Sequence, residues 1–215
     1  MALGGLGAPS PPRAQRRGQN DMGSNMQIYI ELEGITPKIW RRIVVPSSIT
    51  LDRLSDVIQI VMGWSGEHMH LFTIKDRQYM DLPEDDPEAL EEGLFRLGPL
   101  ISSKDRPFTY TYDLGNNWTH LVKLEKMGME DDGEWGNLFC VDGEGSCPPD
   151  DSGGVPGFLE FRRAMADSKD PQYEFFLEWY GGEFDPDDFD PHEANATLLY
   201  YIFWSRERLL PWSED

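Results

Sequence analysis

The stretch FTYTYDLGNNWTHLVKL, residues 108–124, places an aspartate and a histidine within eight positions of each other. Asp113 and His120 are the residue types that exchange protons in acid–base catalysis. Between them lies Gly-Asn-Asn, residues 115–117, which is also typical of a β-hairpin loop. The segment is therefore either a catalytic pair or a turn, and the register of the two strands decides between them.

The apolar pattern favours a three-residue loop over 115–117. A two-residue loop would scatter apolar side chains over both faces, and register follows the buried face. Asp113 then points away from His120 and accepts hydrogen bonds from N–H groups of the turn, Asn117 is left-handed, and His120 lies at the edge of the core. In this register eight side chains share one face, in the pairs Leu114/Trp118, Tyr112/His120, Tyr110/Val122 and Phe108/Leu124.

Two further histidines, His68 and His70, form a His-x-His pattern at the start of a predicted strand, so both imidazoles project from one face. That geometry suits a metal ion, but a zinc centre has three or four protein ligands. Another ligand would have to come from His120, from an acidic residue or from a cysteine across the sheet. We therefore expect one histidine at the edge of the core and the other exposed.

Two cysteines, Cys140 and Cys147, lie in an acidic loop rich in glycine and proline. They could form a disulfide, supply half of a metal site or remain free, and free thiols are the usual state in a cytosolic protein. The sequence therefore predicts free thiols, no stoichiometric zinc and no cofactor.

Acidic residues outnumber basic ones by 39 to 19, which gives a net charge of −20. Residues 1–25 are rich in Gly, Pro and Ala and have no apolar periodicity, which predicts a disordered tail. This tail carries three arginines and one aspartate, so the charge of the remaining chain is near −22. Such a body repels phosphate, and we expect no direct DNA binding. The sequence shows no secretory or membrane-spanning segment, which predicts a soluble cytoplasmic protein.

The one basic cluster outside the tail consists of Lys38, Arg41 and Arg42, beside Trp40. It could hold an anionic ligand, but pairing with neighbouring carboxylates is the favoured interpretation in so acidic a chain. The acidic segment DPDDFD, residues 185–190, lacks the central glycine of a calcium-binding loop and is interpreted as solvated. No GxSxG, Walker, GxGxxG or HExxH motif occurs, which argues against a familiar enzyme class.

The elements that must position these residues follow from apolar periodicity. Strands are predicted over 26–33, 37–46, 70–75, 79–82, 108–113 and 118–126, the first two paired antiparallel. A helix is predicted from its N-cap at Thr50 to Gly63. One helical turn is predicted after Pro87, and residues 129–154 are expected to form an unusually long irregular segment.

Three helices are predicted in the last third of the chain. Strands come first and helices last, which predicts an α+β fold: an antiparallel sheet with a helix after the second strand and C-terminal helices packed on one face. We expect a single domain over 26–208 and a C-terminal tail over 209–215. The residues expected to face inward are Phe158, Phe161 and Met165 in the first of these helices; Tyr173, Phe176, Leu177 and Tyr180 in the second, which begins at Asp170; and Ala194, Leu198, Tyr201 and Ile202 in the third, which begins at Asp190.

Five blocks occur in a fixed order between Met26 and about Leu199: ITPKIWRRIVVP; TLDRLSDVIQIVMGW followed by HMHLF; YTYDLGNNWTHLVKLE; CVDGEGSCPPDDSGG followed by PGFLEF; and GGEFDPDDFD. Together they resemble the plasmid pRiA-type open-reading-frame-three-like family. Members of that family are mostly of unknown function, and some carry the label of a transposon passenger protein or TnpR resolvase. The resemblance implies a compact α+β fold.

The resemblance also implies which residues occupy motif positions. Two departures reduce the case for a metal or redox centre: Asn117 stands where an acidic residue is expected, and Ser152 stands where many members have cysteine. The motif positions are Trp40, Arg41, Arg42, Trp64, His70, Asp113, Gly115, Trp118, His120, Cys147, Pro148, Pro149, Asp151, Gly153 and Gly154.

The function predicted from the sequence is that of an acidic, soluble binding or accessory domain, associated through the family label with mobile genetic elements, that docks a protein or a small ligand. The alternative is a metal-dependent hydrolase or nuclease that uses His68, His70 and His120. A resolvase would need a serine nucleophile served by several arginines, which this acidic body does not favour. The predicted binding residues are Arg41, Arg42, Trp64, Asp113, Trp118 and His120.

Overall fold

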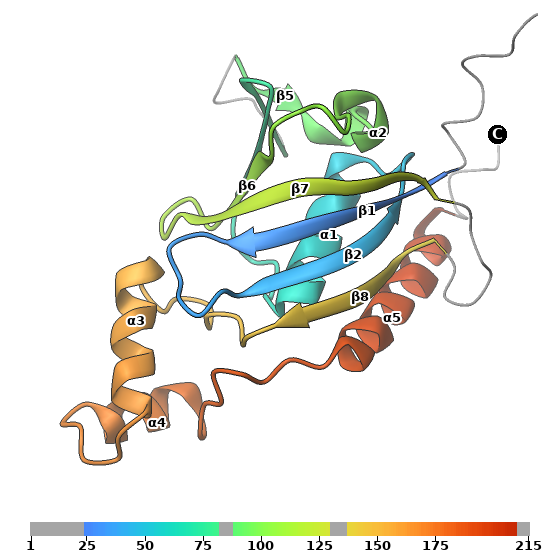
Figure 1. The fold of residues 1–215 in the computed structure, drawn as a ribbon. Helices are drawn as coiled ribbons and strands as arrows, with labels where there is room; N and C mark the ends of the chain where they lie inside the picture. Colours follow the sequence, from blue (N-terminus) through green and yellow to red (C-terminus); the bar gives the residue numbers. More distant parts are fainter. Residues whose placement is uncertain (1–23, 82–87, 130–136, 210–215) are drawn as a thin grey trace, which may run out of the picture.

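The computed structural model describes residues 24–81, 88–129 and 137–209, which form a mixed α+β structure built on one sheet (Figure 1). The sheet has eight strands in the order β5-β4-β3-β6-β7-β1-β2-β8. Its strand pairs are antiparallel except β4 and β5, which run parallel. The strands are β1 (Asn25–Leu32), β2 (Trp40–Pro46), β3 (His70–Ile74), β4 (Arg77–Met80), β5 (Leu90–Glu91), β6 (Phe108–Tyr112), β7 (Trp118–Met129) and β8 (Phe139–Glu144).

The predicted N-terminal hairpin and helix are confirmed. β1 and β2 pair antiparallel with Ile28 opposite Ile43, and the alternating apolar residues of β1 are fully buried. The helix α1 (Leu51–Met62) follows β2, and its Leu51, Leu54, Ile58 and Val61 are buried on one face. Gly63 ends α1 in the left-handed conformation at φ 97°, where its N–H donates to the carbonyl of Gln59. Thr50 occupies the N-cap position, although its side chain makes no capping hydrogen bond.

The remaining helices take two different positions. α5 (Pro191–Leu209) contacts α1 and β8, and its Ala194 and Leu198 are buried as predicted. α3 (Gly154–Met165) and α4 (Tyr173–Tyr180) lie together beyond the end of the sheet (Figure 1). The inward face predicted for the helix after Asp170 is found in part: Tyr173, Phe176 and Leu177 are half-buried and Phe176 packs against the core, whereas Tyr180 is exposed and no residue of α4 is fully buried. Two shorter helical pieces, η3 (Glu92–Leu94) and α2 (Leu97–Leu100), precede β6.

One strand lies where the sequence predicts a long irregular segment. β8 pairs with β2 at the edge of the sheet, with a register shift between Arg42 and Ile43. Its sequence, FCVDGE, has no regular alternation and contains Gly143, which explains why periodicity fails to find it. The helical turn predicted directly after Pro87 is wrong, because residues 88–91 form a turn, a bend and β5, and the short helix η3 begins only at Glu92.

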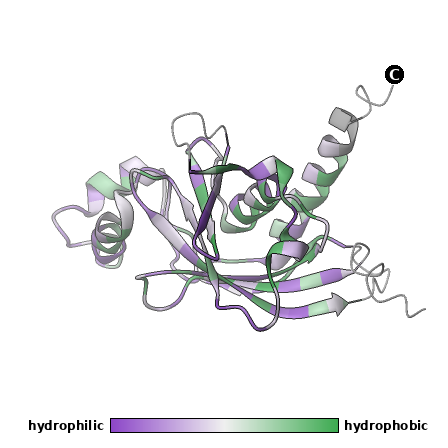
Figure 2. Ribbon diagram, turned by 90° about the horizontal axis from the view of Figure 1, so that it is seen from above, coloured by the Kyte–Doolittle hydropathy of each residue, from purple (hydrophilic) through white to green (hydrophobic). Residues whose placement is uncertain are grey.

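Hydrophobic and hydrophilic residues alternate along the strands, as Figure 2 shows. The core lies between the sheet and α1, with fully buried side chains that include Phe72, Tyr110, Tyr112 and Trp118. Among the described residues, no helix is both long and apolar enough to cross a bilayer.

Candidate functional site

The hairpin between β6 and β7 buries the predicted face but has a different register. Tyr112 pairs with Trp118 and Tyr110 with His120, so the turn holds five residues, 113–117, instead of three. Both ends of this turn, Asp113 at φ 53° and Asn117 at φ 55°, are left-handed, which allows the wider loop. The predicted register is therefore wrong by two residues, a shift that keeps the side chains of the two strands on their predicted face and leaves Leu114 in the turn.

Asp113 serves the turn, as the sequence predicts. One oxygen, Oδ1, accepts hydrogen bonds from the backbone N–H groups of Gly115 (3.0 Å) and Asn116 (3.2 Å). The other, Oδ2, accepts one from Nδ2 of Asn116 at 2.6 Å. Burial alone would raise the pKa of Asp113, but these hydrogen bonds and the nearby His68 lower it, so the carboxylate is ionised at neutral pH.

His120 lies in the core and not at its edge. Its side chain is fully buried, its Nδ1 lies 3.1 Å from the carbonyl oxygen of Tyr110, and Trp64 meets it edge to face at 5.1 Å between ring centroids. Burial lowers the pKa of His120 to about 4, so the imidazole is neutral at neutral pH. In the described part of the chain His120 and Asp113 share no hydrogen bond, and they form no acid–base pair.

His70 is engaged elsewhere. Its Nε2 lies 2.8 and 3.0 Å from the two carboxylate oxygens of Glu92, which is buried. Burial raises the pKa of Glu92, and the hydrogen bond with His70 opposes that rise. The three histidines of the metal hypothesis, His68, His70 and His120, therefore have separate partners and do not form one ligand set among the described residues.

Three loops that are distant in sequence meet beside the hairpin turn: residues 64–69, residues 113–117 and residues 147–154. We call this region the three-loop site. The indole N–H of Trp64 donates to the carbonyl of Pro148 at 3.0 Å. The carboxylate of Asp150 accepts from the backbone N–H of Ser65 at 3.1 Å and from the hydroxyl of Tyr112 at 3.3 Å. These contacts fix the third loop on the first.

Gly154 shows how closely two of these loops approach. Its φ is +68°, and a Cβ at this position would lie 2.8 Å from the carbonyl oxygen of Asn116. A side chain would therefore push the third loop away from the hairpin turn, which gives glycine a steric reason at this motif position.

One mixed group of possible metal ligands lies at the three-loop site. His68, Asp113 and Asp151 each offer one ligand atom within 4.8 Å of the other two, and within the described ranges no other group of three does so. The imidazole of His68 lies between the two carboxylates, with Nδ1 3.9 Å from Oδ2 of Asp113 and Nε2 3.7 Å from Oδ1 of Asp151. The exposed side-chain fractions are 28%, 9% and 76% respectively, so the group opens to solvent on the side of Asp151.

Two of the predicted binding residues, Trp64 and Trp118, form the floor of this site instead of its surface. Trp64 is 7% exposed and stacks on Tyr112 at 4.5 Å between centroids, and Trp118 is 1% exposed. With His120 they make a buried aromatic layer beneath the loops. A ligand at the site would therefore meet the polar loops and not these rings.

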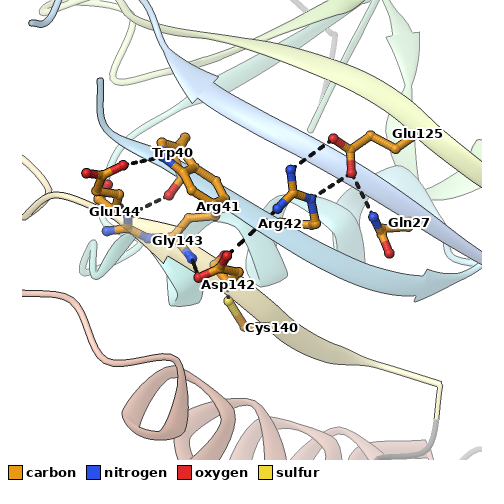
Figure 3. Close-up of polar contacts among 9 residues, drawn as sticks. All are labelled: Gln27, Trp40, Arg41, Arg42, Glu125, Cys140, Asp142, Gly143 and Glu144. Atoms are coloured by element: carbon orange, nitrogen blue, oxygen red, sulfur yellow. Dashed lines mark hydrogen bonds and ion pairs between the residues drawn. The ribbon is translucent and has the colours of Figure 1, made fainter. Parts of the chain in front are cut away.

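The predicted basic cluster turns out to be structural (Figure 3). Arg41 is 1% exposed and donates to the carbonyl oxygens of Trp40, Val61, Glu144 and Gly145 at 2.8 to 3.0 Å. Its guanidinium also lies 3.6 Å from the ring centroid of Phe189. Burial lowers the pKa of Arg41, opposed by the two neighbouring cysteines. Carbonyl groups, and not the expected carboxylates, surround this buried cation.

Arg42 points to the opposite face of the sheet and pairs with carboxylates, as predicted. It donates from Nε (2.7 Å) and a terminal nitrogen (3.2 Å) to Glu125, and lies 3.9 Å from Asp142 (Figure 3). Hydrogen bonding to Glu125 raises the pKa of Arg42. Lys38 pairs with Glu31 at 2.8 Å. All three members of the basic cluster thus have partners within the chain.

Both cysteines are free thiols, which confirms the prediction. Burial raises the pKa of Cys140 to about 11 and raises that of Cys147 further. Thiols of this kind are poor nucleophiles at neutral pH, because the thiolate is the reactive form.

The sequence matches the family described as plasmid pRiA4b ORF-3-like protein over residues 24–193. The chain belongs to that family. It is 32% identical over 185 residues to an uncharacterised protein of Sinorhizobium fredii, covering 83% of this chain and 90% of that protein. A crystal structure of a protein of unknown function from Methanosarcina mazei superposes with a TM-score of 0.73 at 32% identity, covering 79% of this chain and 97% of that one.

The three-loop site is built from sequence blocks by which this chain resembles the plasmid pRiA4b ORF-3-like family. Three of the five sequence blocks supply its three loops, although more than 80 residues separate Trp64 from Pro148. Sequence reasoning missed His68 as a neighbour of Asp113 and Asp151, and it missed the anchoring role of Asp150. The sequence does contain a signal for Asp150 and Asp151, because two consecutive aspartates follow Pro149 in a loop whose glycines suggest close approach to another segment of the chain.

Proposed function

We propose that this chain is a binding or accessory domain whose recognition surface is the three-loop site, in keeping with the family label that associates such proteins with mobile genetic elements. The observation that carries the proposal is the convergence of three sequence-distant loops on a half-open polar group, His68, Asp113 and Asp151. Left-handed non-glycine residues add support, since Asp113, Asn117 and Asp151 all have φ between 53° and 60°. Backbone strain of this kind is retained where the surrounding structure and function require it.

The ligand would meet a polar and mainly acidic surface on a rigid floor. Trp64, Tyr112 and Trp118 hold that floor by stacking and burial, so the loops above them are positioned before any ligand arrives. Preorganised loops lose little conformational entropy on binding. The chemistry of the surface, two carboxylates beside an imidazole, favours cationic groups over anionic ones.

This proposal includes the absence of duplex DNA binding. Lys38, Arg41 and Arg42 supply the basic cluster of the body, and each already has oxygen partners within the chain. Non-specific DNA affinity depends on phosphate contacts from free cations. A gel-shift titration of residues 26–215 should show no binding at physiological salt, and a micromolar complex that weakens steeply with salt would contradict the proposal.

Fluorine NMR of protein labelled with 5-fluorotryptophan tests the recognition surface. A library of metabolites and short peptides is screened, and we expect hits to move the resonance of Trp64 while that of Trp179 on α4 stays unchanged. Trp64→Phe and Trp179→Phe variants assign the two resonances. Hits that act only on Trp179, or a library that never moves Trp64, would count against the three-loop site.

The metal-dependent hydrolase remains the second candidate, because an imidazole and two carboxylates do lie together. Its ligands would be His68, Asp113 and Asp151 instead of the three histidines expected from the sequence. Chromogenic phosphate and carboxylate esters, offered with Mn²⁺ or Zn²⁺, separate the two functions. Turnover that disappears in Asp151→Asn would favour the hydrolase, and we expect none.

A further inference from the structure

We propose that His68, Asp113 and Asp151 bind one divalent transition-metal ion at the three-loop site. This inference rests on the proposed function and names part of the chemistry of that surface. The sequence predicts no bound zinc, and that prediction rests on two histidines of one strand and a pair of cysteines. The structure brings together a different donor set, from three loops.

The three donors lie close enough to surround one ion after a movement of the exposed side chain of Asp151. A divalent ion lies about 2.1 Å from nitrogen and oxygen ligands, so neighbouring ligands of one ion are about 3 Å apart. One ligand atom from each of the three residues lies within 4.8 Å of the other two. The shortest approaches use different ring nitrogens of His68, with Nδ1 3.9 Å from Asp113 and Nε2 3.7 Å from Asp151, and one ion binds only one of these nitrogens. Closing the group around one ion therefore needs a movement of up to about 2 Å. Asp151, 76% exposed at the side chain, can supply that movement, whereas Asp113 is 9% exposed and held by its turn.

The supporting contacts orient each donor. Asp113 receives three hydrogen bonds from Gly115 and Asn116, which fix its plane. The ring of His68 meets Tyr112 edge to face at 5.6 Å between centroids. Asp151 follows Asp150, whose carboxylate is tied to the first loop and to Tyr112. Contacts of this type, around the ligands themselves, typically set metal affinity.

The charges also suit a divalent ion. An imidazole that binds a metal through a ring nitrogen is neutral, so with two carboxylates the donor set would carry a charge near −2, in a chain whose net charge is −20. One nitrogen and two carboxylate oxygens make a mixed donor set, which Mn²⁺ and Zn²⁺ both accept. Three protein ligands leave further coordination positions open to solvent or to a bound group, on the exposed side of Asp151.

Electron paramagnetic resonance with Mn²⁺ tests the site on the full chain after treatment with EDTA and dialysis. Excess Mg²⁺ is included to suppress loose binding to the acidic surface. We expect one Mn²⁺ per chain, and at least tenfold weaker binding in both Asp151→Asn and His68→Gln. The matched control is Asp142→Asn, an exposed aspartate on β8 remote from the loops, which should leave the affinity unchanged.

Paramagnetic broadening locates the ion. Mn²⁺ at the site should broaden the fluorine resonance of Trp64 far more than that of Trp179. An absence of stoichiometric Mn²⁺ binding, equal affinities in the wild type and both site variants, or equal broadening of the two resonances would each overturn the cation site. If metabolites or peptides still move Trp64 in EDTA, the recognition surface stands without the ion; if nothing moves Trp64 with or without Mn²⁺, both proposals fail.

Discussion

Arg41 with its carbonyl acceptors and the three-loop site are both polar groups assembled from distant parts of the chain. They differ in how many of their polar side-chain atoms have hydrogen-bond partners within the chain. Arg41 is buried, and its donors are directed to four carbonyl oxygens within the chain. At the three-loop site, Asp151 is largely exposed and His68 only approaches its two carboxylate neighbours. A polar group whose donors all have acceptors within the chain stabilises the fold, whereas a group whose polar atoms remain open to solvent can accept a ligand.

The largest expected effect on stability comes from substitution of Arg41. Arg41→Met should lower the free energy of unfolding by about 3 kcal/mol or more, because buried carbonyl groups of Val61, Glu144 and Gly145 lose their donors. Arg42→Met removes a more exposed ion pair and should cost less than about 1 kcal/mol. Urea unfolding of both variants measures the difference. Similar losses in the two would remove the distinction between structural and available polar groups.

His120 extends the comparison to pH. Its folded pKa of about 4 lies below the ordinary value of 6.5, so the neutral form is favoured by folding. The stability that it contributes is complete above pH 6.5 and is lost as the pH falls toward 4, by an amount on the order of 3 kcal/mol. His120→Asn, which keeps a donor for the Tyr110 carbonyl, should lack this loss. Unfolding free energies of both proteins at pH 7 and pH 4 give the test, and identical pH dependence would contradict it.

Substitutions at two glycines distinguish the stability cost of backbone strain from the cost of a steric clash between two loops. Gly154 and Gly181 both have positive φ, but a Cβ meets the Asn116 carbonyl only at Gly154 and nothing within 4 Å at Gly181. Gly181→Ala should cost about 1 kcal/mol, from conformation alone. Gly154→Ala should cost clearly more and should disturb the Trp64 fluorescence. Equal costs would mean that the third loop is not pressed against the hairpin turn.

The smallest effect on stability is expected at the open site. Asp151→Asn removes an exposed carboxylate 3.7 Å from His68, so the free energy of unfolding should change by less than about 0.5 kcal/mol. The same substitution is expected to weaken Mn²⁺ binding at least tenfold. Thermal denaturation without added metal provides the stability measurement. A large loss of stability would place Asp151 with Arg41 among the structural groups.

Periodicity predicted the parts of the fold that a regular buried face defines. β1, β2, α1 and the buried face of the β6–β7 hairpin follow from alternation or helical spacing. β8 was missed, because an edge strand with Gly143 needs no alternating pattern. The left-handed conformation predicted for Asn117 is present, but the predicted hairpin register is wrong because Asp113 is left-handed as well and widens the turn, a conformation that an aspartate permits without requiring it.

The candidate site was harder to predict than the fold. Asp113 and Trp64 are among the predicted binding residues and lie at the site, but periodicity does not measure burial, so Trp64, Trp118 and His120 are predicted to bind a ligand although all three are buried. His68 and Asp151 come together only through contacts over more than 80 residues of chain. For Arg41 the sequence predicts carboxylate partners or a bound ligand, because no local pattern indicates four carbonyl acceptors, three of them from distant segments.

The order of strands in the sheet has a consequence during synthesis. β1 and β2 emerge from the ribosome before the other described strands, yet their outer neighbours are β7 and β8, which begin at Trp118 and Phe139. Both edges of the nascent β1–β2 hairpin therefore have unpaired backbone N–H and C=O groups while much of the chain is still being synthesised. Such open edges can pair with strands of other chains. The charged side chains of Arg42 on β2 and Glu31 on β1 stand on that hairpin from the start, and they would discourage such pairing until the late strands arrive.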